Sequence, residues 1–210
     1  MSPERLYTNE IINNMSLKNK FLRDQLVQPI FIHENEKSEN NIPGLGKNKI
    51  LFESNIIKNI SNDLKNGCRN FIFFFVPKNK DNIHFNTSFQ EEILLKIKKE
   101  FNSEIVIWVD LCLCSFTKTG HCCLFEDQKI NYTESLKIMS DIGLSYVRGG
   151  ADGIAPSSML SGIVNSARIK LDSHNFIHIP IMSYSTKFAS NFYGPFRAAA
   201  DSSPSFGDRT

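Results

Sequence analysis

The chain has 210 residues, enough for one domain with a sizeable core, and its 41% hydrophobic and 22% charged residues are typical of a globular protein. A net charge of +2, with acids and bases interspersed, gives no reason to expect a nucleic acid or a membrane surface as partner. The longest apolar run, 71–77, is too short to span a bilayer, and the N-terminus lacks a signal core, so we expect a cytoplasmic protein.

Strand-like and helix-like segments alternate along the whole chain. The predicted strands are 25–33, 71–77, 105–114, 151–156 and 177–185. The predicted helices are 50–67, 88–101, 132–150 and 161–175. Gly67 is expected to end the first helix, and Ser88 with Glu91 has the spacing of a capping box at the start of the second.

Strands that alternate with helices indicate a parallel sheet covered by helices, either doubly wound or closed into a barrel. No Gly-rich nucleotide-binding loop follows any predicted strand, which favours the (β/α)8 TIM barrel. About five of the eight strand-helix units are present, whereas a complete barrel typically needs about 250 residues. We therefore expect an α/β fold with a short N-terminal arm at 1–22 and an incomplete TIM-barrel catalytic domain at 23–210.

Four of the five cysteines fall within DLCLCSFTKTGHCC, residues 110–123. Alternate residues of a strand share a face, so Asp110, Cys112 and Cys114 are expected to point the same way. Gly120 permits a sharp turn that could return Cys122 over that face. Three thiolates at the carboxyl end of a strand leave one tetrahedral position open, which is the pattern of a catalytic zinc site.

Burial as a small apolar side chain is the alternative for each of these thiols, because free cysteine is commonly found in protein cores. Four cysteines close together in a reducing compartment nevertheless favour a metal site. We expect His121 and Cys123 to pack beside the ligands rather than bind, because adjacent residues rarely coordinate one ion.

Lys187 is the second candidate for chemistry, since it follows directly after the last predicted strand. Active sites of barrels gather at the carboxyl ends of the strands. Apolar and hydroxyl neighbours favour the neutral amine of a lysine, which can attack a ketone and form a Schiff base. A solvated loop lysine is the alternative, because most lysines are exposed.

Two segments carry a resemblance to one family. DLCLCSFTKTGHC resembles the zinc-binding signature of porphobilinogen synthase, also called 5-aminolevulinate dehydratase, and PIMSYSTKFASNFYGPFR (180–197) resembles its active-site segment. The resemblance runs from about residue 5 to residue 210 and is most specific over 105–123, 151–157 and 180–210. It implies the zinc-dependent type, because members that use magnesium instead carry aspartates where this chain has cysteines.

The resemblance also implies a role for each candidate residue. Cys112, Cys114 and Cys122 match the three ligands of the catalytic zinc, and Lys187 matches the lysine that forms the Schiff base. The implied substrate-binding residues are Arg197 and Arg209, which hold a carboxylate, Asp110 and Ser157, which orient the substrate near the reacting amine, and Tyr193 and Phe196, which line the pocket.

Membership would imply a lyase that condenses two molecules of 5-aminolevulinate to porphobilinogen with loss of two waters, in tetrapyrrole (heme) biosynthesis. Lys187 would be the amine nucleophile and Asp110 a proton-transfer or orienting group. The resemblance further implies zinc as cofactor, allows magnesium as an allosteric ion, and implies a homo-octamer for a complete chain.

The sequence departs from the family at several positions. Cys123 stands where glycine is usual, and Ser158 and Ser161 stand where aspartates are common. The family's second Schiff-base lysine and last barrel strands should follow residue 210, so we expect the 210-residue chain alone to be inactive and to fold poorly. Two alternatives stay open: an inactive zinc-binding fragment of a truncated or decaying gene, and a metal-independent Schiff-base aldolase, which would have no need of three converging cysteines.

Overall fold

The computed structural model describes residues 25–35, 41–188 and 190–206, so the predicted N-terminal arm at 1–22 lies outside the described residues. The helices and strands follow one another in this order: β1 (Gln28–His33), β2 (Ile50–Leu51), α2 (Ile56–Lys65), β3 (Asn70–Val76), α3 (Ser88–Phe101), the short 3-10 helix η3 (Asn102–Glu104), β4 (Val106–Leu111), β5 (Phe125–Glu126), β6 (Lys129–Ile130), α4 (Tyr132–Arg148), β7 (Gly153–Pro156), α5 (Ile163–Asp172) and α6 (Tyr193–Ala199).

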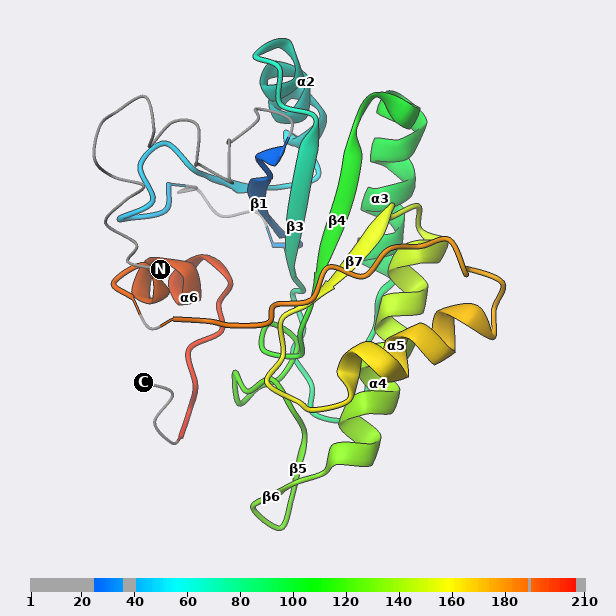
Figure 1. The fold of residues 1–210 in the computed structure, drawn as a ribbon. Coiled ribbons are helices and arrows are strands. Elements are labelled where there is room, and N and C mark those ends of the chain that lie inside the picture. The colour runs from blue at the N-terminus through cyan, green and yellow to red at the C-terminus, as the bar shows by residue number, and fades with distance from the viewer. Residues whose placement is uncertain (1–24, 36–40, 189, 207–210) are drawn as a thin grey trace, which may run out of the picture.

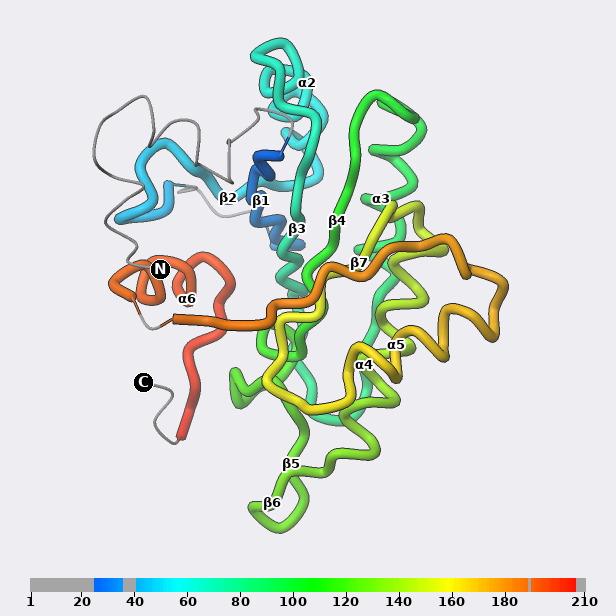
Figure 2. Tube along the Cα trace, in the orientation of Figure 1, coloured from blue at the N-terminus to red at the C-terminus, as the bar shows by residue number. Residues whose placement is uncertain are grey.

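Five strands form one parallel sheet in the order β2-β1-β3-β4-β7, which confirms the predicted α/β class. In Figure 1 helices α3, α4 and α5 lie on one side of this sheet, whereas α6 lies on the other. The strands run toward the end of the molecule at which the β5–β6 hairpin projects. The continuous tube in Figure 2 shows the chain crossing to the α6 side after α5.

The central strand β3 is buried on both faces, as its uninterrupted apolar sequence predicts. Phe71, Phe73 and Phe75 pack with the helices α2 to α5 in the larger core. Ile72 and Phe74 point to the opposite face and belong to a second, smaller core beneath α6. The period of two along a strand therefore supplies both cores from one segment.

The predicted helix at 50–67 is corrected by the structure to a short strand followed by a helix. Ile50 and Leu51 pair with β1, and the helix α2 begins only at Ile56. The Asn55 side chain accepts a hydrogen bond from the Phe52 amide at 3.0 Å, which closes a turn between the two elements. Apolar residues at Ile50 and Leu51 fit a strand as well as a helix, so periodicity could not separate them.

The end of α2 confirms the expected role of Gly67. Its φ is +85°, and its amide donates to the Leu64 carbonyl while the Cys68 amide donates to the Asp63 carbonyl. This pair of bonds is the Schellman arrangement, which glycine accommodates because it has no Cβ. The start of α3 differs slightly from the expectation: Thr87 is the N-cap residue, and its hydroxyl donates to the Glu91 carboxylate at 3.0 Å.

The predicted strand at 177–185 is also corrected, because the structure has an isolated bridge there instead of a strand. Ile181 pairs with Ile154 of β7, and the Met182 amide donates to the Ile154 carbonyl at 2.9 Å. The segment thus follows β7 in parallel, yet Pro180 cannot donate a backbone hydrogen bond. The β5–β6 hairpin, η3 and α6 were not predicted, and the remaining elements differ from prediction only by a few residues at their ends.

Close contact between β4 and β7 depends on one glycine. Trp108 pairs directly with Gly153, and the indole ring lies over the glycine, where a Cβ atom would come within 2.4 Å of the Trp108 Cζ3 atom. The indole therefore occupies the space that a side chain at position 153 would need. Trp108 and Gly153 form a size-matched pair on the α6 face of the sheet.

Gly153→Val tests this pair. The substitution should lower the free energy of unfolding by about 1–3 kcal/mol, because an overpacked core must displace the indole. In a Trp108→Ala background the same valine should be neutral or stabilising, since it then fills vacated space with a good strand former. Chemical denaturation of the four proteins of the cycle measures the coupling. An equal effect of the valine in both backgrounds would contradict the proposed size matching.

Candidate functional site

The carboxyl ends of β4 and β7 bring the first candidate residues together. Asp110 lies in β4 opposite Ala155 of β7, and it shares the α6 face of the sheet with Trp108. Ser157 follows β7 directly, and its amide donates to the Leu111 carbonyl at 3.2 Å. The parallel register therefore places these two polar side chains side by side, as the barrel interpretation expects.

The cysteines lie just beyond the strand rather than within it. β4 ends at Leu111, so the prediction that a strand continues through Cys114 is wrong. The chain turns instead, with the Phe116 and Thr117 amides both donating to the Leu113 carbonyl at 2.9 Å. The alternation argument does not hold for the residues after Leu111, and the convergence of the thiols comes from this turn.

Cys112, Cys114 and Cys122 nevertheless converge in a buried cluster of their own, separate from both apolar cores. Hydrogen bonds with Cys114 and Cys122, together with burial, raise the pKa of the Cys112 thiol well above its ordinary value. The bond with Cys112 lowers the pKa of Cys114, but the bond with Cys122, burial and nearby charge outweigh it and raise that pKa to about 12. The Cys112 and Cys114 thiols thus favour the neutral form, and the three thiols are hydrogen-bonded to one another.

Three clustered thiols form a donor set that favours zinc over magnesium or calcium. Among the residues that the structure describes, no three His, Cys, Asp or Glu side chains stand in an arrangement ready to hold a metal ion. Coordination would therefore require the thiols to lose protons and exchange their mutual hydrogen bonds for bonds to a metal. The chemistry of the cluster fits zinc, while its present geometry is that of a hydrogen-bonded trio.

Asp110 lies against this cluster in a low-dielectric setting. Its Oδ1 atom is fully buried and makes no hydrogen bond within the described part of the chain. Burial raises the pKa of this carboxyl group to about 7, although a hydrogen bond with Ser157 and the charge of Lys187 act in the opposite direction. A carboxyl group with such a pKa can both accept and donate a proton near neutral pH.

Lys187 lies in the segment that follows β7, and its side chain extends toward Ser157 and Asp110. Its Nζ atom donates a hydrogen bond to the Ser157 carbonyl and lies 5.3 Å from the centre of the Tyr184 ring. The residue is otherwise exposed, so the expected apolar enclosure of the amine is not seen. Sequence reasoning missed Tyr184. Its position three residues before Lys187, as an aromatic side chain beside a candidate amine, was the signal that could have found it.

The remaining predicted residues lie on α6 or beyond it. Arg197 and Tyr193 stand on the same side of this helix, with the guanidinium carbon 5.4 Å from the tyrosine ring centre. Phe196 packs against Phe31 and Phe74, so it contributes to the smaller core. Arg209 lies outside the described residues.

The neighbours of the cysteines behave as packing residues. His121 packs its ring against Phe125 and Phe206 and bonds through Nε2 to the Phe206 carbonyl at 3.0 Å. Cys123 is buried as part of the larger core and not of the thiol cluster. The Ser158 hydroxyl donates to the Cys122 carbonyl at 3.2 Å, a link between the β7 loop and the cysteine loop that sequence reasoning missed.

A strap formed by residues 201–206 crosses the cysteine loop. The Ser205 amide donates to the Thr119 carbonyl at 2.9 Å, and Lys80 forms an ion pair of 2.8 Å with Asp201. Gly120 has a φ of +69°, and a Cβ atom there would lie 2.3 Å from the Ser203 carbonyl oxygen. The glycine is therefore needed both for the turn, as expected, and for the approach of the strap.

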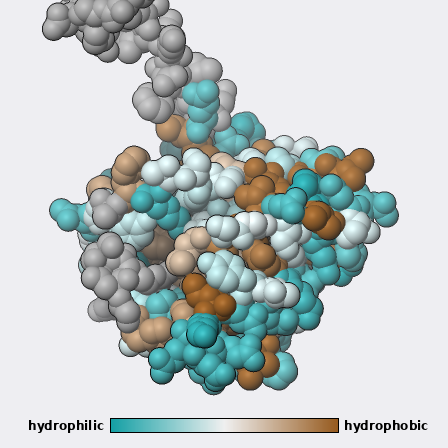
Figure 3. All heavy atoms as spheres, turned by 60° about the horizontal axis from the view of Figure 1, so that its bottom comes forward, coloured by the Kyte–Doolittle hydropathy of each residue, from teal (hydrophilic) through white to brown (hydrophobic). Residues whose placement is uncertain are grey.

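Figure 3 turns the carboxyl ends of the strands toward the viewer, where apolar residues form separate patches between polar ones.

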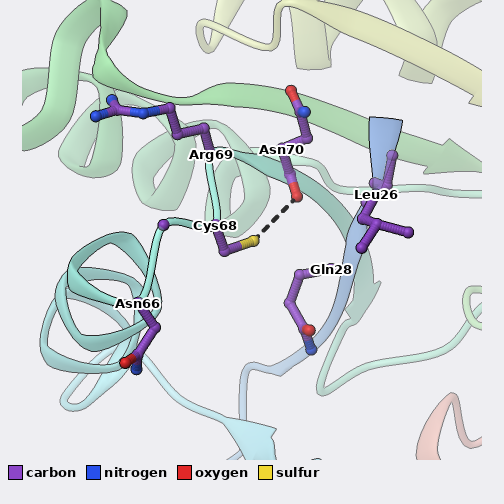
Figure 4. Close-up of a pocket in the computed structure, with 8 residues that line it drawn as sticks. Leu26, Gln28, Asn66, Cys68, Arg69 and Asn70 are labelled. Carbon is purple, nitrogen blue, oxygen red and sulfur yellow. Dashed lines mark hydrogen bonds between the residues drawn. The ribbon is translucent and has the colours of Figure 1, made fainter. Parts of the chain in front are cut away.

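A pocket of about 190 Å³ lies at the other end of the sheet, at the amino ends of β1 and β3 (Figure 4). Its lining comprises Leu26, Val27, Gln28, Asn66, Gly67, Cys68, Arg69 and Asn70. None of the predicted site residues lines it, so the pocket adds nothing to the candidate chemistry.

Every helix in the described ranges is too short or too polar to cross a lipid bilayer.

Comparison with known proteins identifies relatives of the whole chain. The family model for Delta-aminolevulinic acid dehydratase matches residues 1–210. The Delta-aminolevulinic acid dehydratase of Methanothermus sociabilis is 35% identical over 208 residues, and that of Bacillus subtilis (strain 168) is 34% identical over 209 residues. Both alignments cover 98% of this chain, but only 65% and 64% of the respective relatives.

The fold matches a solved structure of the same kind of enzyme. The crystal structure of delta-aminolevulinic acid dehydratase (porphobilinogen synthase) from Toxoplasma gondii ME49, in complex with the reaction product porphobilinogen, superposes with a TM-score of 0.85 at 25% sequence identity. The match covers 100% of this chain and 61% of that one. The TIM-barrel prediction is thereby confirmed over the part of the barrel that this chain represents.

Gly120→Ala tests the contact between the cysteine loop and the strap, with Gly46→Ala as the matched control. Gly46 has a similar φ of +60° but no atom within 4 Å of the added Cβ. Both variants should lose about 1 kcal/mol from backbone strain, whereas Gly120→Ala should lose at least about 1 kcal/mol more, because it displaces the Ser203 backbone. Denaturant unfolding gives both losses. Equal losses of unfolding free energy in the two variants would show that the added methyl group at position 120 does not clash with the strap.

Proposed function

The chain belongs to the delta-aminolevulinic acid dehydratase family, and on that premise we propose that it carries the first-substrate half of a porphobilinogen synthase active site. The reaction is the condensation of two molecules of 5-aminolevulinate to porphobilinogen, with loss of two waters. The observation that carries the proposal is the meeting of three thiols, Asp110 and Lys187 at the carboxyl ends of β4 and β7. Shared ancestry and this constellation both support this chemistry.

Lys187 is proposed to bind the first substrate covalently. Its neutral amine attacks the ketone carbon of 5-aminolevulinate, a carbon–nitrogen bond forms, and loss of the ketone oxygen as water leaves a Schiff base. The Ser157 carbonyl, which accepts a hydrogen bond from Nζ, supports this role because it aims the amine toward β7 and Asp110. The Tyr184 ring lies beside the amine, with its centre 5.3 Å from Nζ.

Asp110 is proposed to accept and return protons during these steps. A carboxyl pKa of about 7, raised mainly by burial, suits a group that must change its protonation state at neutral pH. Its unpartnered Oδ1 atom has capacity to accept a hydrogen bond from the substrate amine. Ser157 would keep the carboxyl group oriented through the hydrogen bond that they share.

Arg197 is proposed to hold the substrate carboxylate, with Arg209 as its partner in this role. The planar guanidinium group can pair with a carboxylate through two parallel hydrogen bonds. Tyr193, whose ring lies beside the Arg197 guanidinium, would limit the orientations of that group. Phe196 would act indirectly, because its ring anchors α6 on the sheet.

Cys112, Cys114 and Cys122 are proposed to hold zinc as thiolates. When bound, zinc would act as a Lewis acid toward a substrate amine, carbonyl or water. The burial of the three thiols supports a site screened from bulk water. A metal-independent Schiff-base aldolase would have no use for this cluster, which favours the porphobilinogen synthase interpretation. Magnesium as an allosteric ion, a homo-octamer and a cytoplasmic location remain proposals from family membership.

The zinc proposal predicts about one zinc ion per chain, the stoichiometry of a single site with three thiolate ligands. Cys112→Ala combined with Cys114→Ala should reduce the zinc content to background, because two of three ligands are lost. Cys68→Ala is the control, since this half-buried cysteine lies by the pocket of Figure 4 and should leave zinc content unchanged. Elemental analysis after dialysis measures all three proteins. Zinc retention by the double variant would remove the metal proposal.

The Schiff-base proposal predicts a covalent adduct at Lys187. Borohydride added with 5-aminolevulinate should reduce the imine to a stable amine, which peptide mass mapping can place on a single lysine. Lys187→Ala should abolish the adduct, whereas Lys170→Ala should retain it, because Lys170 pairs with Asp141. An adduct found only on other lysines would rule out this assignment. Zinc binding without any adduct would favour the inactive zinc-binding alternative.

A further inference from the structure

The helix that carries Arg197 depends on the rest of the protein for its position. α6 has seven residues, and its N-cap residue, Phe192, makes no side-chain capping bond. Isolated helices shorter than about 12–15 residues are marginal in water, so contacts with the sheet must hold this one in place. The position of Arg197 therefore depends on those contacts.

Part of the anchorage is apolar. The Phe196 ring lies 5.5 Å from that of Phe31 and 5.2 Å from that of Phe74, with edge-to-face geometry in both pairs. Ala199 and Ala200 are buried in the same small core. These apolar contacts hold α6 on the sheet, but the hydrophobic effect is non-directional, so it leaves the end of the helix some freedom to shift.

A polar contact restricts that freedom at the end of the helix nearest Arg197. His33, the last residue of β1, is buried, and its Nε2 atom lies 2.6 Å from the Ala199 carbonyl oxygen. A carbonyl oxygen can only accept, so the imidazole must carry a proton on Nε2 and donate. The bond satisfies one of the carbonyl groups that the end of a helix leaves without a partner inside the helix.

We propose that His33 is a positioning residue for Arg197: it fixes the carboxyl end of α6 to β1 and so holds the guanidinium group where it can meet the substrate carboxylate. Arg197 precedes Ala199 by two positions, so rotation of the helix end about the apolar contacts would move the arginine directly. His33 touches no reacting group itself. The inference rests on the proposed function, because it assigns Arg197 to the carboxylate.

Two substitutions of His33 separate the hydrogen bond from packing. His33→Leu keeps an apolar body in the buried position but leaves the Ala199 carbonyl without this donor. His33→Gln restores an N–H group that can reach the same carbonyl. Ile60→Ala serves as the control, because Ile60 is fully buried in the larger core on the other face of the sheet and should destabilise the protein without moving α6.

The first measurement is the concentration of 5-aminolevulinate that gives half-maximal borohydride trapping at Lys187. His33→Leu should raise this concentration about tenfold, the scale of a buried acceptor that loses its donor, while the maximal extent of trapping stays the same. His33→Gln should recover most of the loss, and Ile60→Ala should match the wild type. A value for His33→Leu equal to that of the wild type, or equal to that of Ile60→Ala, would overturn the inference.

A double-mutant cycle tests whether His33 acts through the arginine. Arg197→Ala alone should weaken half-maximal trapping, and adding His33→Leu to it should cause little further change. Additive effects of the two substitutions would show that His33 acts on something other than Arg197 and would overturn the proposal.

Hydrogen exchange at the Phe196 and Ala200 amides provides a readout that does not depend on chemistry. Both amides donate hydrogen bonds within α6, so they should exchange faster in His33→Leu and recover in His33→Gln. If the wild-type chain is never trapped at Lys187, the proposed function fails, and exchange alone decides whether His33 fixes α6. Unchanged exchange in His33→Leu would overturn the anchoring itself.

Discussion

Parallel pairing around β7 is the constraint on which the rest of the site depends. On one side β7 pairs with β4, which sets Asp110 opposite Ala155 and brings Ser157 next to it. On the other side the segment that leads to Lys187 bonds to the Ile154 and Pro156 carbonyls. A strand of four residues thus fixes the separation of a carboxyl group and an amine that lie far apart in the sequence. A slip of one residue would send alternate side chains to the wrong face.

One face of the sheet holds the larger apolar core, and the other face carries the proposed catalytic carboxyl group. The face covered by α2 to α5 holds the larger core and none of the proposed reacting groups. The opposite face carries Asp110, and its smaller core is completed by α6. Since α6 also carries Arg197, one short helix both covers apolar side chains and presents the residue proposed to bind the substrate carboxylate. Substitutions in the smaller core should therefore affect ligand affinity together with stability.

Strongly patterned segments could be read from the sequence, whereas short elements and tertiary contacts could not. The apolar run of β3 and the periodicity of α3 located both elements to within a residue. The edge strand β2 has only two residues, Ile50 and Leu51, which are too few for a period to show, so the sequence predicts a helix there. The cysteine cluster was expected, but for a partly wrong reason, because the turn after Leu111 and not strand alternation gathers the thiols. The contact of His33 with Ala199 joins residues 166 positions apart, which no local pattern encodes.

The strap over the cysteine loop has a consequence for the order in which the polypeptide can be completed. His121 bonds to a residue 85 positions later in the chain, and Gly120 touches Ser203 in the same contact. All four cysteines of residues 110–123 therefore leave the ribosome before the strap at 201–206 has been synthesised. Until then the loop lacks the contacts of the strap with Thr119, Gly120 and His121, which would hold it in place. The cysteine loop would thus reach its final conformation only late in synthesis, after residues 201–206 have emerged.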